Sequence, residues 1–395
     1  MRVLQIHNSY QFAGGEDAVV AAEAELLKSH RETVETYIVS NHDIRGVTER
    51  ISTALSVGYS HRAREAVRAR IASMRPDIVH VHNTFPLLTP SVYDACADAG
   101  VPVVQTLHNY RLGCINGLLL RNGDVCEKCW TGSPYWGALH ACYRDSTFGS
   151  LAASVAYARH RRADTWNTKV TRFIALCEFA AKKFEAFGID PEKIVVKPNF
   201  AEDPGRVTDG GDRHGALFVG RLSPEKGILD LIEAWREISY PLTVIGDGPL
   251  LDEIRRRATS QVRLVGRYSG PEILREMKKA AFLVVPSRCY ESSPPRVIIE
   301  AFACGLPVVG SAIGAIEEVV EKSNAGRLFA PGSADQLRAT ITTLISDGSA
   351  LGGLSTRARE YYRQHFTPER SYEQLRDIYE QCIRTAASRS NPVGV

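Results

Sequence analysis

The chain has 395 residues, of which 24% are charged and 44% hydrophobic; this composition is ordinary for a globular protein, and the length favours two domains over one. Its net charge of +3 is too small to indicate nucleic acid as a partner, and no run of about 18 apolar residues predicts a membrane-spanning helix. The N-terminus begins with strand-like residues rather than a signal peptide, and nine cysteines in such a chain indicate thiols or metal ligands rather than disulfides, so we expect a cytoplasmic protein.

Strand-like and helix-like segments alternate along the first half of the chain. Strands are expected at residues 2–6, 77–82, 101–107, 173–176 and 194–199. His82 ends the second of these strands, and His108 directly follows the third. Because open α/β sheets bind ligands at the carboxyl ends of their parallel strands, we expect His108 to face a ligand site. His82 fits a structural role equally well.

Two glycines, Gly14 and Gly15, stand between the first strand and a helix whose apolar residues recur at helical spacing. Glycines in this position let the backbone approach a ligand while the N–H groups of the helix point at it. A plain turn explains the same pair equally well.

Four cysteines lie in a turn-rich stretch at about residues 112–145: Cys114, Cys126, Cys129 and Cys142. Cys126 and Cys129 are spaced like two ligands of a zinc knuckle, and one cysteine on each side would complete a tetrahedral site. The stretch has little apolar pattern, so we favour a structural zinc ion that supplies stability in place of a core, with His140 as a spare ligand. Reduced, partly buried cysteines and a redox pair are the alternatives, and no thioredoxin-like βαβ unit surrounds the pair.

Residues 149–183 are helical in pattern and basic, with aromatic side chains between the cations, among them Tyr157, Trp166 and Phe173. Such a face could rest on an anionic membrane surface, where lipid-linked molecules reside. A solvated charged face is the more common meaning of a run of this kind. Both interpretations stay open: a peripheral contact with the inner face of a membrane, and an ordinary solvated surface.

Residues 202–215 are rich in Asp and Gly and predict a linker, after which a strand at 215–220 begins a second series of strands and helices. Arg221 and Lys226 come between this strand and a helix that begins near residue 228. Two cations beside the positive end of a helix favour a phosphate group, although two surface cations would have the same sequence.

Two carboxylates bracket the loop that follows an apolar strand at 282–285. Glu291 lies in the loop, and Glu300 lies on a helix that starts near Pro295 and stops before Gly305. Both can face the ligand-binding edge of the second sheet. The alternation of strands and helices on both sides of the linker predicts an α/β protein with two doubly wound, Rossmann-like domains facing a cleft.

Residues 286–309, which contain Glu291 and Glu300, resemble the Glu-x7-Glu signature of the retaining glycosyltransferases of family four, which have the GT-B fold. Eight residues separate the two glutamates here instead of seven. The resemblance implies that Glu291 approaches the donor sugar and that Glu300 binds the ribose hydroxyls of the nucleotide.

Two further segments are similar to those of the same family. Residues 220–227 resemble its Gly-Arg-x4-Lys-Gly segment, which implies that Arg221 and Lys226 hold the donor diphosphate. His108 lies in a segment that resembles the family's Thr-x-His-Asp, with Asn109 in place of the Asp. The resemblance implies that His108 lies near the reacting sugar.

The resemblance covers nearly the whole chain and implies places for the remaining glycines and the domains. Gly14 and Gly15 are expected to border the acceptor, and Gly246 the nucleotide. Gly266 and Arg267 are expected to lie near the base. A last helix is expected to cross back onto the first domain. The expected domains are residues 1–203 with the cysteine-rich insertion, residues 204–368, and the crossing helix in residues 369–395.

The resemblance implies transfer of a sugar, with retained anomeric configuration, from a UDP-, GDP- or dTDP-sugar to a glycan or lipid-linked acceptor in cell-surface polysaccharide synthesis. No catalytic metal is expected. Two alternatives stay open: a nucleotide-sugar epimerase with the GT-B fold, and a partner subunit that keeps the fold without the chemistry. The extra residue between Glu291 and Glu300 supports the second alternative.

Overall fold

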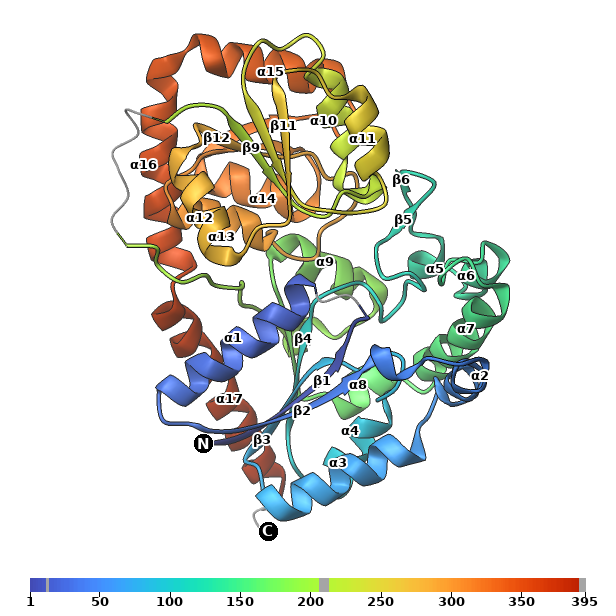
Figure 1. The fold of residues 1–395 in the computed structure, drawn as a ribbon. Helices are drawn as coiled ribbons and strands as arrows, with labels where there is room; N and C mark the ends of the chain where they lie inside the picture. The colour runs from blue at the N-terminus through green and yellow to red at the C-terminus, as the bar shows by residue number, and fades with distance from the viewer. Residues whose placement is uncertain (12–13, 206–212, 391–395) are drawn as a thin grey trace.

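The computed structural model describes residues 1–11, 14–205 and 213–390 and shows two α/β domains, one above the other in Figure 1. Each domain is built on a six-stranded sheet in which all neighbouring strands are parallel, and helices cover the sheets. This confirms the predicted pair of Rossmann-like domains in the GT-B arrangement. Residues 206–212 of the predicted linker lie outside the described residues.

The N-terminal sheet has the strand order β2-β1-β3-β4-β7-β8. Its strands are β1 (Arg2–Ser9), β2 (Thr33–Ser40), β3 (Ile78–Asn83), β4 (Val103–Leu107), β7 (Arg172–Ala175) and β8 (Ile194–Val196). The helices of this domain are α1 (Gly15–Ser29), α2 (Val47–Ser56), α3 (His61–Met74), α4 (Ser91–Asp98), α8 (Thr165–Lys169) and α9 (Glu178–Phe187), with 3-10 helices η1 (Asn41–Asp43) and η2 (Pro191–Lys193). The strand β2 was not predicted, because this edge strand is half-exposed and mixes polar with apolar residues.

The C-terminal sheet has the strand order β11-β10-β9-β12-β13-β14. Its strands are β9 (Ala216–Val219), β10 (Leu242–Ile245), β11 (Val262–Gly266), β12 (Phe282–Val285), β13 (Val308–Ser311) and β14 (Gly326–Phe329). Its helices are η3 (Pro224–Lys226), α10 (Ile228–Ala234), α11 (Leu251–Arg257), α12 (Gly270–Lys279), α13 (Arg296–Ala303), α14 (Gly314–Ser323), α15 (Ala334–Ser346) and α16 (Gly348–His365). The apolar runs of the four inner strands, β9, β10, β12 and β13, are largely buried because helices cover both faces of the sheet, whereas the edge strands β11 and β14 are partly exposed.

The strand order reverses between β1 and β3 in the first sheet and between β9 and β12 in the second. Connections leave such a point in opposite directions, which opens a crevice at the carboxyl ends of the strands. The segments after β1, β9 and β12 carry Gly15, Lys226 and Glu291. The fold therefore directs the predicted ligand residues of both domains toward the same gap.

The cysteine-rich insertion lies between β4 and β7. It contains a two-stranded hairpin and two short helices, β5 (Leu120–Arg121), β6 (Asp124–Val125), α5 (Lys128–Thr131) and α6 (Tyr135–Leu139), and the helix α7 (Thr147–Arg162) follows it. Ile115, Cys129 and Tyr157 share a small apolar cluster that fixes the insertion to the domain. In Figure 1 the hairpin extends from this domain toward the C-terminal one.

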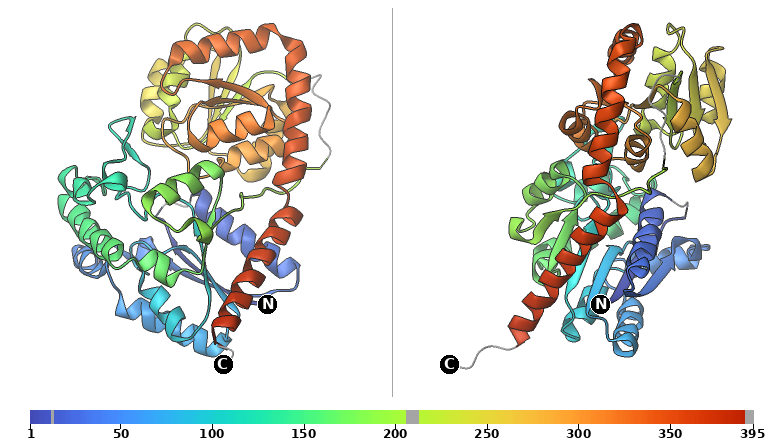
Figure 2. Two further views of the ribbon diagram at one scale, coloured as in Figure 1. Left: turned by 180° about the vertical axis from the view of Figure 1, so that it is seen from behind. Right: turned by 90° about the vertical axis from the view of Figure 1, so that its left-hand side faces the viewer.

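The last helix, α17 (Pro368–Ser390), follows α16 and runs down the N-terminal domain (Figure 2). Its residues Leu375, Ile378, Tyr379 and Cys382 are buried in one cluster with strand residues of the N-terminal sheet, Val3, Ile78, Val104 and Ile174. The chain thus crosses twice between the domains, once before β9 and once through α17.

Candidate functional site

The two domains enclose a cavity of about 350 Å³ at the carboxyl ends of both sheets. Its wall includes Gly15, Glu16, Val19, His108 and Asn199 from the N-terminal domain and Gly220, Lys226, Ser287, Glu291 and Arg296 from the C-terminal domain. Four of the residues that the sequence singled out therefore meet here: Gly15, His108, Lys226 and Glu291.

Lys226 and Glu291 form an ion pair on the C-terminal wall of this cavity. Nζ of Lys226 donates to Oε1 of Glu291 across 2.6 Å, and Oγ of Ser287 donates to the same oxygen across 3.0 Å. Burial lowers the pKa of Lys226, but the Glu291 carboxylate together with Cys289 and Glu225 raises it above its usual range, so the ammonium group stays charged. A bound anion can replace Glu291 as the hydrogen-bond partner of the Lys226 ammonium.

A glycine permits the close approach of the two loops that carry this ion pair. Gly227, directly after Lys226, has a φ of 65°, and a Cβ atom there would lie 1.8 Å from the carbonyl oxygen of Pro286. Any larger residue would push the loops apart. The backbone N–H of Arg288 also donates to the carbonyl of Glu225 across 2.9 Å, which holds the turn after β9 against the loop after β12.

Three charged residues predicted on the nucleotide side lie outside the lining of this cavity. Arg221 is exposed, and Nε of the exposed Arg267 lies 3.2 Å from Oδ2 of Asp247. Glu300 is half-buried on α13, where Oε1 accepts from Nη2 of Arg296 across 3.0 Å, and burial raises the pKa of Glu300. Arg296, the partner of Glu300, does line the cavity.

The predicted glycines lie at the ends of strands or the start of a helix. Gly246 follows β10 with a φ of 147°, and a Cβ atom there would lie 1.9 Å from the carbonyl oxygen of Gly220. Its N–H donates to the carbonyl of Gly266 across 2.8 Å. Gly14 precedes α1, and its N–H donates to Oδ2 of Asp17 across 2.8 Å. Only glycine allows the close backbone contact at position 246.

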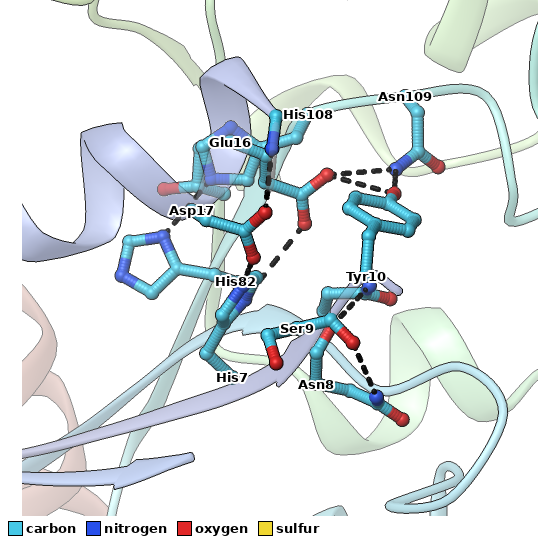
Figure 3. A network of polar contacts seen from close by, with 12 residues as sticks. His7, Asn8, Ser9, Tyr10, Glu16, Asp17, His82, His108 and Asn109 are labelled. Carbon is cyan, nitrogen blue, oxygen red and sulfur yellow. Dashed lines mark hydrogen bonds and ion pairs between the residues drawn. The ribbon is translucent and has the colours of Figure 1, made fainter. Parts of the chain in front are cut away.

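Glu16 is a site residue that the sequence analysis missed. Its Oε2 accepts from the hydroxyl of Tyr10 across 2.9 Å and from Nδ2 of Asn109 across 3.3 Å (Figure 3). Nδ1 of His7 lies 3.9 Å from Oε1. Burial raises the pKa of Glu16 to about 8, so the carboxyl group is protonated at neutral pH. Its place directly after Gly15, at the ligand edge of the sheet, is the signal that could have found it.

Buried polar side chains lie behind His108, on the side away from the cavity. Nε2 of His108 and Nδ1 of His82 share a hydrogen bond of 3.0 Å (Figure 3). Nε2 of His82 lies 3.4 Å from Oε1 of Glu23, and Nζ of Lys197 lies 3.6 Å from Oε2 of the same residue. Burial raises the pKa of Glu23, but His80 and Lys197 lower it more, to about 2, so this buried carboxylate is ionised.

Within the described residues, one group of possible metal ligands is found: Glu23, His80 and His82. One ligand atom of each lies within 4.8 Å of the other two. The ammonium of Lys197 already supplies a positive charge beside Glu23. Nδ1 of His80 also lies 2.6 Å from the hydroxyl of Tyr379. These contacts do not fit a divalent cation, which an adjacent ammonium would repel, and they describe a buried ion pair with hydrogen bonds.

The four cysteines of the insertion are free thiols: Cys114 and Cys129 are buried, and Cys126 and Cys142 are half-buried. Burial, together with Cys114 and Cys142 nearby, raises the pKa of Cys129 to about 12. Among the described residues these sulfur atoms do not gather within 4.8 Å of one another as a metal-ligand group. Since Zn–S bonds are about 2.3 Å long, a zinc ion would have to draw the thiols closer together.

The basic stretch at residues 149–183 does not form the single mixed face that the sequence suggested. Tyr157, Trp166 and Phe173 are buried and do not lie between surface cations. Exposed large apolar side chains instead cluster on α2 and α7, which are in contact: Val47, Ile51, Leu55, Phe148, Leu151 and Val155. We call these six residues the apolar patch.

A groove of about 300 Å³ lies between α2 and α7 and is lined by part of the apolar patch together with Arg50 and Arg144. Both arginines are exposed. Over the part of the chain that the structure describes, no helix is both long and apolar enough to cross a membrane.

Two family models match the chain, one for each domain. A model described as "Glycosyl transferase 4-like domain" matches residues 14–199, and one described as "Glycosyl transferases group 1" matches residues 213–347. The first match contains His108, and the second contains Lys226 and Glu291. The cavity therefore lies where the two matched regions meet.

Curated relatives are similar over part of their length. A glycosyltransferase of Methanocaldococcus jannaschii is 32% identical over 175 residues, which are 43% of this chain and 49% of that protein. The phosphatidyl-myo-inositol mannosyltransferase of Mycolicibacterium smegmatis is 30% identical over 239 residues, which are 57% of this chain and 60% of that protein. The chain thus spans about half to three fifths of the length of these relatives.

Solved structures share the fold over nearly the whole chain. The structure of HepE from Anabaena in complex with UDP has a TM-score of 0.67 and 18% sequence identity, and the match covers 96% of this chain and 100% of that chain. At this identity the likeness concerns the fold, including the arrangement of two domains around a cleft.

Proposed function

Because the chain belongs to the glycosyltransferases of family four, which have the GT-B fold, we propose that it transfers a sugar from a nucleotide-sugar donor to an acceptor with retained anomeric configuration. The observation that carries this proposal is the ion pair of Lys226 and Glu291 in a cavity that both domains line, with His108 also in its wall. In this arrangement the donor diphosphate is the anion that Lys226 binds. The sugar then lies in the cavity near Glu291 and His108.

The proposed chemistry follows from where charge develops. The bond between C1 of the sugar and the diphosphate oxygen breaks while a bond from C1 to the acceptor oxygen forms on the same face of the sugar. The acceptor hydroxyl gives its proton to the leaving phosphate oxygen, so no side chain has to act as the base. Negative charge grows on that phosphate, and the ammonium of Lys226 stabilises it.

We assign the nucleotide end of the donor to the other residues that the family resemblance indicates. Glu300 binds the ribose hydroxyls, Arg221 is a second cation for the diphosphate, and the backbone at Gly246 and Gly266 borders the nucleotide beside Arg267. Arg221 and Glu300 lie outside the lining of the cavity, so these roles require their side chains to move when the donor binds.

The acceptor is assigned to the N-terminal wall, where Gly15 and Glu16 line the cavity and Gly14 begins the helix. The name of the Mycolicibacterium smegmatis relative specifies a lipid, phosphatidyl-myo-inositol, and the Anabaena structure contains UDP. These names support a UDP-sugar as the first donor to test, before GDP- and dTDP-sugars, and a glycan or lipid-linked acceptor. Cell-surface polysaccharide synthesis is the proposed setting.

A lipid-linked acceptor would bring the enzyme to a membrane surface. The apolar patch on α2 and α7, with Arg50 and Arg144 beside it, supports a peripheral contact with the inner face of a membrane. This contact belongs to the N-terminal domain, the same domain to which the acceptor is assigned.

The first experiment is a thermal-shift screen with UDP-, GDP- and dTDP-sugars, followed by a transfer assay with the donor that stabilises the protein. The variant Lys226→Ala is expected to lower the transfer rate by about 100-fold or more, because it removes the cation beside the leaving phosphate. Lys28→Ala, on the exposed side of α1, is the matched control and should leave the rate unchanged.

Three outcomes would contradict the proposal. Wild-type rates in Lys226→Ala would mean that this ammonium does not contact the leaving group. Conversion of the donor sugar to its epimer without any acceptor would identify an epimerase. Stabilisation by no nucleotide-sugar at all would favour a partner subunit without chemistry.

A further inference from the structure

His108 is supported by buried side chains that take no part in the proposed reaction. Its Nε2 shares the 3.0 Å hydrogen bond with Nδ1 of His82, whose other nitrogen lies 3.4 Å from Oε1 of Glu23 (Figure 3 shows the two histidines). The side chains of His82 and Glu23 are 0% and 4% exposed. Bulk water therefore does not compete for these contacts. The position and charge of Glu23 can thus affect His82, and through His82 the ring of His108 in the cavity wall.

Glu23 is held in a fixed position on α1, the helix whose first turn lines the cavity. Oε1 of Glu23 lies 3.0 Å from Nδ1 of His80 and accepts from Nε2 of Gln5 across 3.3 Å. Nζ of Lys197 lies 3.6 Å from Oε2. Partners from β1, β3 and the segment after β8 thus fix the carboxylate from several sides.

The charge of Glu23 decides where the protons of the two histidines lie. Burial lowers the pKa of both rings, that of His108 to about 3, so each ring is neutral and carries one N–H. Nε2 of His82 makes no hydrogen bond within the described residues, but the Glu23 carboxylate lies 3.4 Å away, and its negative charge favours an N–H over a lone pair at that nitrogen, so the proton of His82 lies on Nε2. Nδ1 of His82 then accepts from the Nε2–H of His108, which leaves Nδ1 of His108 without a proton.

We propose that Glu23 is a positioning residue that, through His82, fixes the tautomer of His108 so that Nδ1 of His108 accepts a hydrogen bond from a substrate hydroxyl group in the cavity. The inference rests on the proposed function, because that hydroxyl belongs to the donor sugar or to the acceptor. Without the charge at position 23, His82 can take its other tautomer, and His108 then presents an N–H to the same hydroxyl. The hydroxyl has to rotate, and the reacting groups lose their alignment.

The experiment reads the tautomer of His108 in the full chain by long-range proton–nitrogen correlation NMR of histidine-labelled protein, with the His108 signals assigned from their loss in His108→Gln. In the wild type we expect a protonated Nε2 and a bare Nδ1. In Glu23→Gln we expect a changed His108 tautomer and a fall in kcat of about 10- to 100-fold. Glu23→Asp keeps the charge and should retain the wild-type tautomer, as should Glu25→Gln, an exposed matched control on the same helix.

Binding of UDP, measured by calorimetry, separates this inference from the proposed function. Glu23→Gln should leave UDP binding unchanged, because Lys226 lies on the other domain. If Glu23→Gln does not fold, the double variant Glu23→Gln/Lys197→Met removes both buried charges together and should show the same tautomer change. An unchanged His108 tautomer in a folded variant overturns the role of Glu23. A wild-type protein that transfers no sugar overturns the proposed function instead, while the tautomer measurement still decides what Glu23 does.

Discussion

At the scale of single residues, Glu291 and Glu300 occupy different electrostatic positions. Oε1 of Glu291 lies 2.6 Å from Nζ of Lys226, so a diphosphate that reaches this ammonium has to compete with the carboxylate. Glu300 is paired with Arg296 on α13 and does not touch Lys226 or line the cavity. The two glutamates should therefore affect nucleotide binding in opposite ways.

We predict that Glu300→Gln weakens binding of the nucleoside diphosphate, whereas Glu291→Gln leaves it unchanged or strengthens it. A carboxylate accepts charge-assisted hydrogen bonds from ribose hydroxyls, each worth about 1.5–3 kcal/mol, and glutamine keeps only part of that. At position 291 the substitution removes a competitor for Lys226, so only sugar transfer should slow. Calorimetry with the nucleoside diphosphate measures both variants, with Glu321→Gln on the exposed surface of α14 as the control.

Equal losses at both positions, or a larger loss at Glu291, would contradict this assignment. Such a result would place the extra residue of the signature on the other side of the loop, and Glu291 would then be the nucleotide ligand. The spacing of eight residues between the two glutamates makes this outcome informative.

The sequence singled out residues that follow strands, and Glu300 on a helix through the family resemblance, but it did not single out Glu23 on α1. His108, Lys226 and Glu291 were found because each follows an apolar strand, where the fold class itself places ligands. Glu23 lies within the helical pattern of α1, where a glutamate usually faces water. Its burial depends on Lys197 and other side chains from distant segments, and no local pattern reports that.

At the scale of elements, the cysteine-rich insertion is the least regular part of the chain. Its two strands have two residues each, and α5 and α6 are single short turns of helix. Cys129 packs in a small apolar cluster with Ile115 and Tyr157, so part of the insertion does have a core. The hairpin itself has two exposed residues in β6 and little burial to hold it.

We therefore predict that the protein purifies with about one zinc ion per chain, bound by Cys114, Cys126, Cys129 and Cys142. Binding would deprotonate the thiols and draw them into a tetrahedral group, which would stabilise the hairpin beyond what its small cluster supplies. Metal analysis of the reduced, folded protein is the measurement. Cys126→Ser should lose the metal and lower the melting temperature.

Cys96→Ser, at a buried cysteine on α4 outside the insertion, is the control and should keep the metal. Reduced, folded protein without zinc would rule out the site and leave four reduced, partly buried cysteines.

Strands with a continuous apolar pattern were predicted from the sequence, and the strand that mixes polar with apolar residues was not. The central strands β3, β4 and β12 bury every residue and are rich in valine and other apolar residues, and the sequence predicted all three. The edge strand β2 was missed. For α7 the sequence predicted the helix but not its orientation: Tyr157 faces the core, and Phe148 and Leu151 face outward. Which side of a helix is buried depends on its neighbours, here α2 and the insertion.

At the scale of the whole molecule, the loop that carries Glu291 also joins the two domains. The hydroxyl of Tyr110 donates to the carbonyl of Glu291 across 3.3 Å, and Oγ of Ser292 donates to the carbonyl of His108. The ring centroids of Phe179 and Tyr290 lie 4.9 Å apart across the same boundary. A donor that displaces Glu291 from Lys226 would thus also act on the contacts that hold the domains together.

A small cavity shares lining residues both with the groove beside the apolar patch and with the large cavity between the domains. Phe85 lines both the groove between α2 and α7 and a small cavity of about 50 Å³ that also contains His108. His108 in turn lines the large cavity between the domains.

We predict that the protein binds vesicles of phosphatidylcholine with phosphatidylglycerol and not vesicles of phosphatidylcholine alone, because the patch buries apolar side chains while Arg50 and Arg144 meet anionic headgroups, each worth about 1 kcal/mol near the surface. Binding should weaken as salt screens the charges. The variant Leu55→Ser/Phe148→Ser/Leu151→Ser should lose vesicle binding in a sedimentation assay. It should keep the wild-type affinity for the nucleoside diphosphate, since the patch lies outside the lining of the large cavity.

Val125→Ser/Val196→Ser changes exposed apolar side chains on other elements and should bind vesicles like the wild type. Equal vesicle binding by the triple variant and the wild type would show that the patch does not contact the membrane.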